Sequence, residues 1–148
     1  MSKKNEYYKK TEARLYLYQD IKTKLENDIL DLNDLKKEKI TGKSKDILYR
    51  SVAGGIRLSP EELQEIKINS ICESIKKNTR EISAINDALN SISTDPYANI
   101  IPLKYMNGKT DEKIAEEICC DPSTVRRNRK RLVQKISVRL YGVDAILS

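Results

Sequence analysis

Apolar residues recur every three or four positions over two long stretches of the chain, the pattern of amphipathic helices. In residues 5–39 the apolar positions at this spacing include Leu15, Tyr18, Ile21, Leu25, Ile29, Leu32 and Leu35. In residues 68–92 the spacing alternates strictly between three and four, at Ile68, Ile71, Ile75, Asn78, Ile82, Ile85, Leu89 and Ile92. This alternation predicts a coiled-coil seam, in which the single asparagine sets the register of pairing.

The segment Ser59-Pro60-Glu61-Glu62 predicts where the second long helix begins. Serine caps a helix, proline suits the first helical position, and Glu62 completes a capping box. Residues 40–58, which include Gly54 and Gly55, are expected to form a connector. Two arrangements remain open: the long helices pair within one chain as an antiparallel hairpin, or two chains pair as a homodimer.

Thr94-Asp95-Pro96 ends the second long helix and predicts a domain boundary. Residues 1–94 are then an elongated helical, coiled-coil region, and residues 95–148 form a small domain. The expected fold is all-α, a long helical hairpin followed by a helix-turn-helix.

Turn-forming and helix-capping residues within the small domain predict short helices. Asn107-Gly108 permits a reversal, and Thr110 can cap a helix over residues 111–118, where Ile114 and Ile118 face the core and Ala115 allows close crossing. Cys119-Cys120 is the expected turn, Asp121 a cap residue, and Pro122 the first residue of the last helix. These are the parts of a helix-turn-helix.

The net charge of +6 is concentrated in one predicted helix. Residues 122–139 contain seven basic residues and no acid, whereas the rest of the chain has 21 basic against 22 acidic residues. The seven are Arg126, Arg127, Arg129, Lys130, Arg131, Lys135 and Arg139. A basic stripe confined to one helix indicates a surface that binds a polyanion, here double-stranded DNA.

A helical wheel assigns roles to the last helix. With Val125 facing inward, Leu132 and Ile136 lie within about 20° of it, so the opposite face would enter the major groove. Arginine suits bidentate bonds to guanine, which makes Arg127 the first candidate for base contact. The predicted outer face comprises Ser123, Arg127, Lys130 and Gln134. Arg126 and Arg131 are assigned to flanking phosphates, Thr124 to a base edge or phosphate, and Lys109 and Thr110 to backbone phosphates.

Composition argues against an enzyme. The chain has no histidine, no acid cluster at catalytic spacing and no glycine-rich phosphate loop. Its three cysteines lack metal-ligand spacing, so we expect reduced thiols, no metal and no cofactor. No run of eighteen apolar residues occurs and residues 1–5 lack the apolar stretch of a signal peptide, so no membrane association and a cytoplasmic location in a bacterial cell are expected.

Three segments carry a resemblance to known DNA-binding proteins: Leu103-Lys-Tyr-Met-Asn-Gly-Lys-Thr, Ile114-Ala-Glu-Glu-Ile and Asp121-Pro-Ser-Thr-Val-Arg-Arg-Asn-Arg-Lys-Arg-Leu. Over about 45 residues the chain resembles region 4 of bacterial sigma factors and, more closely, small phage late-gene regulators of the RinA/ArpU type. The resemblance implies a phage or prophage transcription activator that recruits RNA polymerase. The alternative is a small terminase-like packaging subunit that binds a packaging site through the same motif.

Two residues depart from the pattern of these families. Pro102 falls inside the expected first helix of the motif, where it should kink or delay that helix. Asn128 stands where an apolar or aromatic residue is usual, so it should need a hydrogen-bond partner or exposure.

Overall fold

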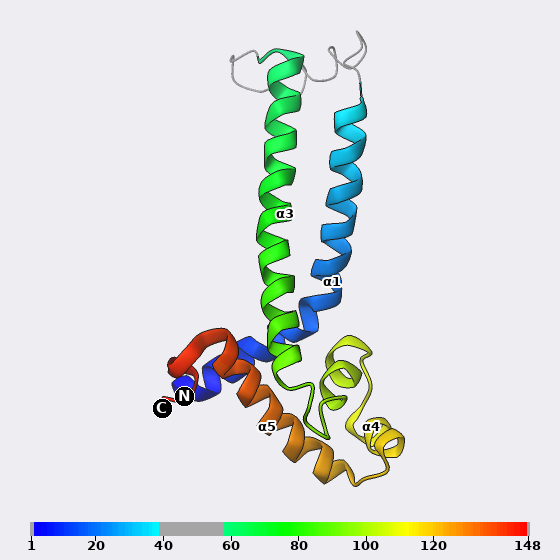
Figure 1. Ribbon diagram of the computed structural model, residues 1–148, viewed down its shortest axis with the longest axis vertical. Helices are drawn as coiled ribbons and strands as arrows, with labels where there is room; N and C mark the ends of the chain where they lie inside the picture. Colours follow the sequence, from blue (N-terminus) through cyan, green and yellow to red (C-terminus); the bar gives the residue numbers. More distant parts are fainter. Residues whose placement is uncertain (1, 39–57, 148) are drawn as a thin grey trace. The chain divides into compact units, whose positions relative to one another are not determined.

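The computed structural model describes residues 2–38 and 58–147, and every regular element in these ranges is a helix (Figure 1). In chain order they are α1 (Lys3–Lys37), α3 (Pro60–Ser91), the π-helical turn η1 (Pro102–Met106), α4 (Asp111–Ile118), α5 (Pro122–Tyr141) and the 3-10 turn η2 (Gly142–Ala145). The predicted all-α fold is confirmed. The predicted connector lies outside the described residues, apart from Leu58.

Ser59 and Thr110 cap the helices that they were predicted to cap. The Glu62 N–H donates to Ser59 Oγ at 3.1 Å, so the serine caps α3 one residue before Pro60. At α4, Thr110 Oγ1 accepts from the Lys113 N–H at 3.3 Å. Each cap supplies an acceptor to an amide that has no partner within its own helix.

The chain divides into two compact units, and α1 and α3 each contribute to both. Unit 1 comprises the residues up to Ile21 and those from Glu81 onward, and unit 2 is the described part of Lys22–Arg80. This division differs from the predicted boundary between residues 94 and 95. The physical reason is that apolar residues early in α1 and late in α3 are buried with the helices of the C-terminal part.

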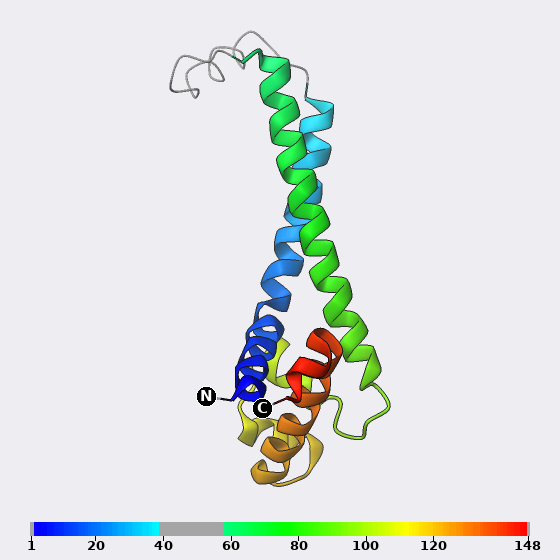
Figure 2. The same ribbon diagram turned by 90° about the vertical axis from the view of Figure 1, so that its left-hand side faces the viewer.

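Unit 2 is an antiparallel pair formed within one chain, where the helices lie side by side in both views (Figures 1 and 2). Gln64 Nε2 donates to the Leu35 carbonyl at 2.7 Å, and Ser74 Oγ donates to Asp28 Oδ2 at 2.7 Å. Because one residue number rises as the other falls, the helices run in opposite directions. The hairpin arrangement that the sequence left open is thus the one observed in unit 2.

A buried carboxylate lies between these paired helices. Asp28 is only 2% exposed and receives bonds from Lys24 and from Ser74. These bonds, that from Lys24 above all, lower the pKa of Asp28. Asn78, predicted to set the register, donates to Ser74 Oγ at 3.4 Å. It is thereby connected through Ser74 to Asp28.

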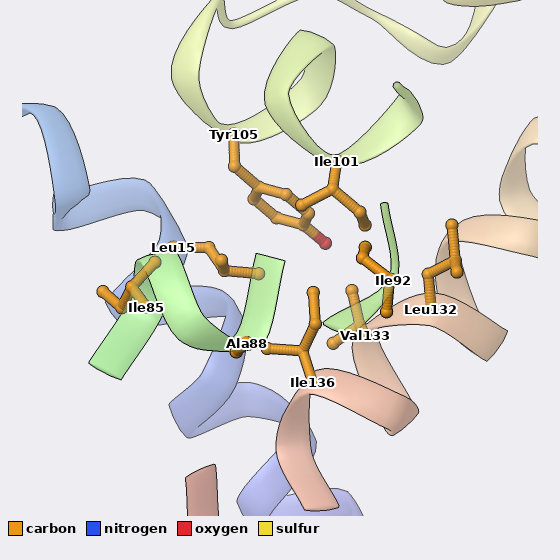
Figure 3. Packing of buried hydrophobic residues seen from close by; sticks show 9 residues of the cluster. All are labelled: Leu15, Ile85, Ala88, Ile92, Ile101, Tyr105, Leu132, Val133 and Ile136. Carbon is orange, nitrogen blue, oxygen red and sulfur yellow. The ribbon is translucent and has the colours of Figure 1, made fainter. Parts of the chain in front are cut away.

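The main core of unit 1 joins four segments that are far apart in the sequence (Figure 3). Leu15 comes from α1, Ile85 and Ala88 from α3, and Tyr105 from η1. The remaining members are Ile92, Ile101, Leu132, Val133 and Ile136. Tyr105 also donates through its hydroxyl to Glu12 at 2.6 Å, so α1 is connected to this core by a polar contact as well as by packing.

Candidate nucleic-acid interface

Helices α4 and α5 form the predicted helix-turn-helix around a small core. That core contains Ile100, Ile114, Ala115 and Val125, all of them at most 3% exposed. The turn between the helices begins at Cys119, whose φ of 57° is the left-handed conformation that commonly ends a helix. The small Ala115 is buried, as expected of a residue at a close helix crossing.

The start of α5 agrees with prediction in position but not in capping chemistry. Pro122 is the first helical residue, as predicted, and Asp121 is the residue before it in extended conformation. The Asp121 side chain accepts no capping hydrogen bond. The expectation that this carboxylate caps α5 is therefore wrong, although its negative charge still lies at the end of the helix that favours it.

Pro102 is accommodated by a change in helix type. It occupies the first position of η1, where a missing N–H removes no helical bond. The wider π turn then closes with the Asn107 N–H donating to the Pro102 carbonyl at 3.0 Å, and Gly108 follows at φ +67°. The expected disturbance of the first motif helix is present as this π turn.

Seven polar residues of α5 are exposed, and three of them, Ser123, Arg127 and Lys130, lie on the side away from the core; the others are Arg126, Arg131, Lys135 and Arg139. The opposite side contains Val125, Leu132 and Ile136, each fully buried. The predicted inward face is therefore buried, and Ser123, Arg127 and Lys130 of the predicted outward face are exposed. Among the described residues, no ion pair involves Arg126, Arg127, Lys130 or Lys135.

The other three basic residues of α5 are paired with carboxylates from elsewhere in the chain. Arg129 pairs with Asp111 of α4 and its side chain is only 14% exposed. Arg139 approaches Asp87 of α3 at 3.4 Å. Arg131 pairs with Asp95, which precedes η1. The seven basic residues of α5 therefore divide into three that are paired with carboxylates of other segments and four that have no such partner among the described residues.

The Asp95–Arg131 pair is bidentate. Arg131 Nη1 and Nη2 donate to the two carboxylate oxygens at 2.6 and 2.9 Å, and the Tyr97 N–H donates to Oδ1 at 2.9 Å. The bonds from Arg131 above all, and then that from Tyr97, lower the pKa of Asp95 to about 2. Arg131 was predicted to contact phosphate, but its guanidinium is directed at this carboxylate.

Asn128 has the partners that its buried position requires. Its Nδ2 donates to the Thr124 carbonyl at 2.9 Å, and its Oδ1 accepts from Arg131 Nη2 at 3.1 Å. The residue is 9% exposed. An asparagine here links the core side of α5 to the Asp95–Arg131 pair.

The remaining predicted contact residues differ in how accessible they are. Gln134 was predicted to face outward, yet it is half-buried and donates to the Ala145 carbonyl at 3.0 Å, because η2 folds back against α5. Lys109 pairs with Glu117 of α4. Thr110 is exposed but is used as the cap of α4, and Thr124 is half-buried.

One cavity of about 500 Å³ borders the exposed side of α5. Its lining residues are Ser2, Lys4, Asn5, Tyr8, Lys130, Arg131 and Gln134. We call it the basic cavity. No sequence pattern associates the start of α1 with α5, because more than a hundred residues separate them and neither segment contains a motif for pairing.

The part of the chain that the structure describes has no group of three or more His, Cys, Asp or Glu residues arranged to hold a metal ion. Within the same residues, no helix is both long enough and apolar enough to cross a membrane. The three cysteines are free thiols, and Cys119 is exposed. The candidate site therefore consists of cationic and polar side chains on a helical framework.

Comparison with known proteins adds no relative: no protein-family model, no curated protein and no solved structure matches this chain.

Proposed function

We propose that this protein binds double-stranded DNA sequence-selectively through α5 and acts as a transcription regulator. One observation carries the proposal: four exposed cations of α5, Arg126, Arg127, Lys130 and Lys135, have no carboxylate partner among the described residues, and α5 itself contains no acid. Exposed cations on one helix repel one another when no acid lies among them, and a polyanion that binds the helix relieves this repulsion.

The geometry of the helix-turn-helix supports duplex DNA as that polyanion. An α-helix fits the major groove, and the first turns of the second helix of such a motif contact base edges. Ser123 and Arg127 lie in these first turns, exposed and opposite the buried Val125. In the proposed complex Arg127 bonds to a guanine and Arg126 to a flanking phosphate.

The finer proposal concerns the regulated process. The resemblance to RinA/ArpU-type regulators favours activation of phage late genes in concert with bacterial RNA polymerase. A packaging subunit with the same motif is distinguished by where it binds in the host and by whether transcripts change. We expect chromatin immunoprecipitation to show a few sharp peaks upstream of transcripts that rise on induction. Peaks confined to a single site with no transcript change would assign the protein to packaging.

DNA binding itself is tested with a salt titration. Fluorescence anisotropy on a labelled duplex should give a log-log slope of about −3 per chain if three of the four unpaired cations meet phosphate. The variant Arg126→Gln/Lys130→Gln should reduce the magnitude of that slope by about 2. Lys36→Gln/Lys37→Gln, which removes the same charge from the end of α1, is the matched control. A flat response of the unaltered protein between 50 and 200 mM salt would refute DNA binding.

A further inference from the structure

The basic cavity brings a second segment of the chain to the exposed side of α5. Lys4 and Tyr8 are one turn apart on α1, and Lys130 and Gln134 are one turn apart on α5, so two helix faces line the same space. Its other lining residues are Ser2, Asn5 and Arg131. All of these residues belong to unit 1.

The charge of this cavity is positive and is not compensated locally. Neither Lys4 nor Lys130 has an ion pair among the described residues, and no Asp or Glu lines the cavity. Arg131 contributes less, because its guanidinium already bonds to Asp95 at 2.6 and 2.9 Å. Hydroxyl and amide groups of the remaining lining residues add neutral donors. Two ammonium groups and several neutral donors that line one cavity are the chemistry that binds a phosphate.

The first turns of α1 are held in place by contacts with α5 and the core. The rings of Tyr7 and Tyr141 lie 5.0 Å apart, and the Arg14 guanidinium lies over the Tyr141 ring at 5.3 Å. Leu15, two turns after Tyr8, is fully buried in the core. Lys4 is therefore presented from a fixed helix, and less conformational entropy is lost when it binds a ligand than in a free arm.

We propose that the basic cavity binds a backbone phosphate of the same DNA duplex that α5 contacts, with Lys4 and Lys130 as its charged ligands. This inference rests on the proposed function. The source of the phosphate follows from position: Lys130 is one turn beyond Arg127 on the same exposed side of α5. A duplex seated on that side carries phosphates along both edges of its groove. Lys130 is thereby assigned to phosphate, and base contact is left to Arg127 and Ser123.

The test compares Lys4→Gln with the unaltered protein in salt titrations on two duplexes, a selected preferred sequence and a scrambled one. We expect Lys4→Gln to reduce the slope by about 0.9 and to weaken binding about 5- to 10-fold at 0.1 M salt on both duplexes alike, since a phosphate contact carries no sequence information. Lys4→Arg, which keeps the charge, should restore both values. Lys22→Gln, the same substitution eighteen residues further along α1, should change neither.

Each other outcome has a distinct meaning. If Lys4→Gln and the unaltered protein bind DNA with the same salt dependence, this inference is overturned and DNA binding stands. Tighter binding by Lys4→Gln would also overturn it, and would mean that the first turn of α1 hinders DNA. Absence of salt dependence in the unaltered protein would instead refute the proposed function.

A free phosphate is separated from a DNA phosphate by a titration without DNA. The protein and Lys4→Gln are titrated with inorganic phosphate at constant ionic strength and followed by NMR. Saturable binding at millimolar phosphate that disappears in Lys4→Gln would assign the cavity to a free anion and overturn the DNA assignment. No saturation in that range, together with the changed DNA slope, is the result expected.

Discussion

The contact between Asp95 and Arg131 predicts a measurable, pH-dependent share of the stability of unit 1. Replacing Asp95 by Asn keeps an oxygen that can accept from the Tyr97 N–H but removes the charge that holds Arg131. The fall in the pKa of Asp95 from 3.8 to about 2 corresponds to roughly 2.4 kcal/mol at about 1.36 kcal/mol per unit. The Arg131 side chain is 39% exposed, so solvent screening reduces this value. We expect Asp95→Asn to lower the free energy of unfolding by about 1 kcal/mol at pH 7.

The sign of the pH dependence follows from the lowered pKa. A carboxylate whose pKa is lower in the folded state stabilises the fold fully above its unfolded value of 3.8, and this stabilisation is lost as the pH falls through about 2. The difference between the unaltered protein and Asp95→Asn should therefore be constant from pH 7 to 5. At pH 3 it should be about half as large.

The assay is urea unfolding followed by circular dichroism for the unaltered protein, Asp95→Asn, Arg131→Gln and the double variant. The double-mutant cycle isolates the coupling between the two side chains, which we expect to be about 1 kcal/mol. A coupling below about 0.3 kcal/mol would show that solvent screens this pair as strongly as it screens an exposed surface ion pair. A difference that persists undiminished at pH 3 would refute the assignment of the effect to the Asp95 charge.

Three further substitutions test other parts of the structure. Tyr105→Phe should lower the free energy of unfolding by about 1–2 kcal/mol, measured in thermal melts, because the buried hydroxyl donates to Glu12 at 2.6 Å. An unchanged melting temperature would mean that the bond between Tyr105 and Glu12 does not hold α1 to the core. Cys119→Gly should raise stability by about 0.5–1 kcal/mol, since φ is 57° at that residue, while Cys120→Gly should lower it; equal effects of the two would contradict the left-handed turn. Arg127→Ala should cost roughly 1–3 kcal/mol of binding on the preferred duplex and little on a scrambled one; equal losses in anisotropy titrations would make Arg127 a phosphate contact.

Local sequence patterns were sufficient wherever a structure depends on neighbouring residues. Ser59 and Thr110 cap the helices that they were predicted to cap, and α4 has the predicted bounds. The inward face of α5 follows from its apolar spacing, as the burial of Val125 and Leu132 shows. Helix ends and amphipathic faces are set within about one or two turns of chain, so they can be predicted from the residues themselves.

The candidate site was predicted less completely, because electrostatic pairing acts between distant segments. The stripe of seven basic residues looked uniform in the sequence, yet Asp87, Asp95 and Asp111 pair with three of them. Gln134 has the outward position of the helical wheel, but η2 brings the Ala145 carbonyl to it. The periodicity of the sequence does not predict such contacts, because the contacts depend on how the helices pack against one another and not on the pattern within each helix.

The sequence by itself determined that the chain is all-helical, where its long helices and its helix-turn-helix begin, and which face of α5 is apolar. Those properties depend on propensity, capping and spacing, which are local. Only the tertiary structure decided that the long helices pair within one chain in unit 2, that Leu15 and Ile85 share a core with α5, and that Lys4 and Lys130 line the same cavity. These features depend on contacts across tens of residues or more, where many partners have similar chemistry and only the packing of the whole unit selects among them.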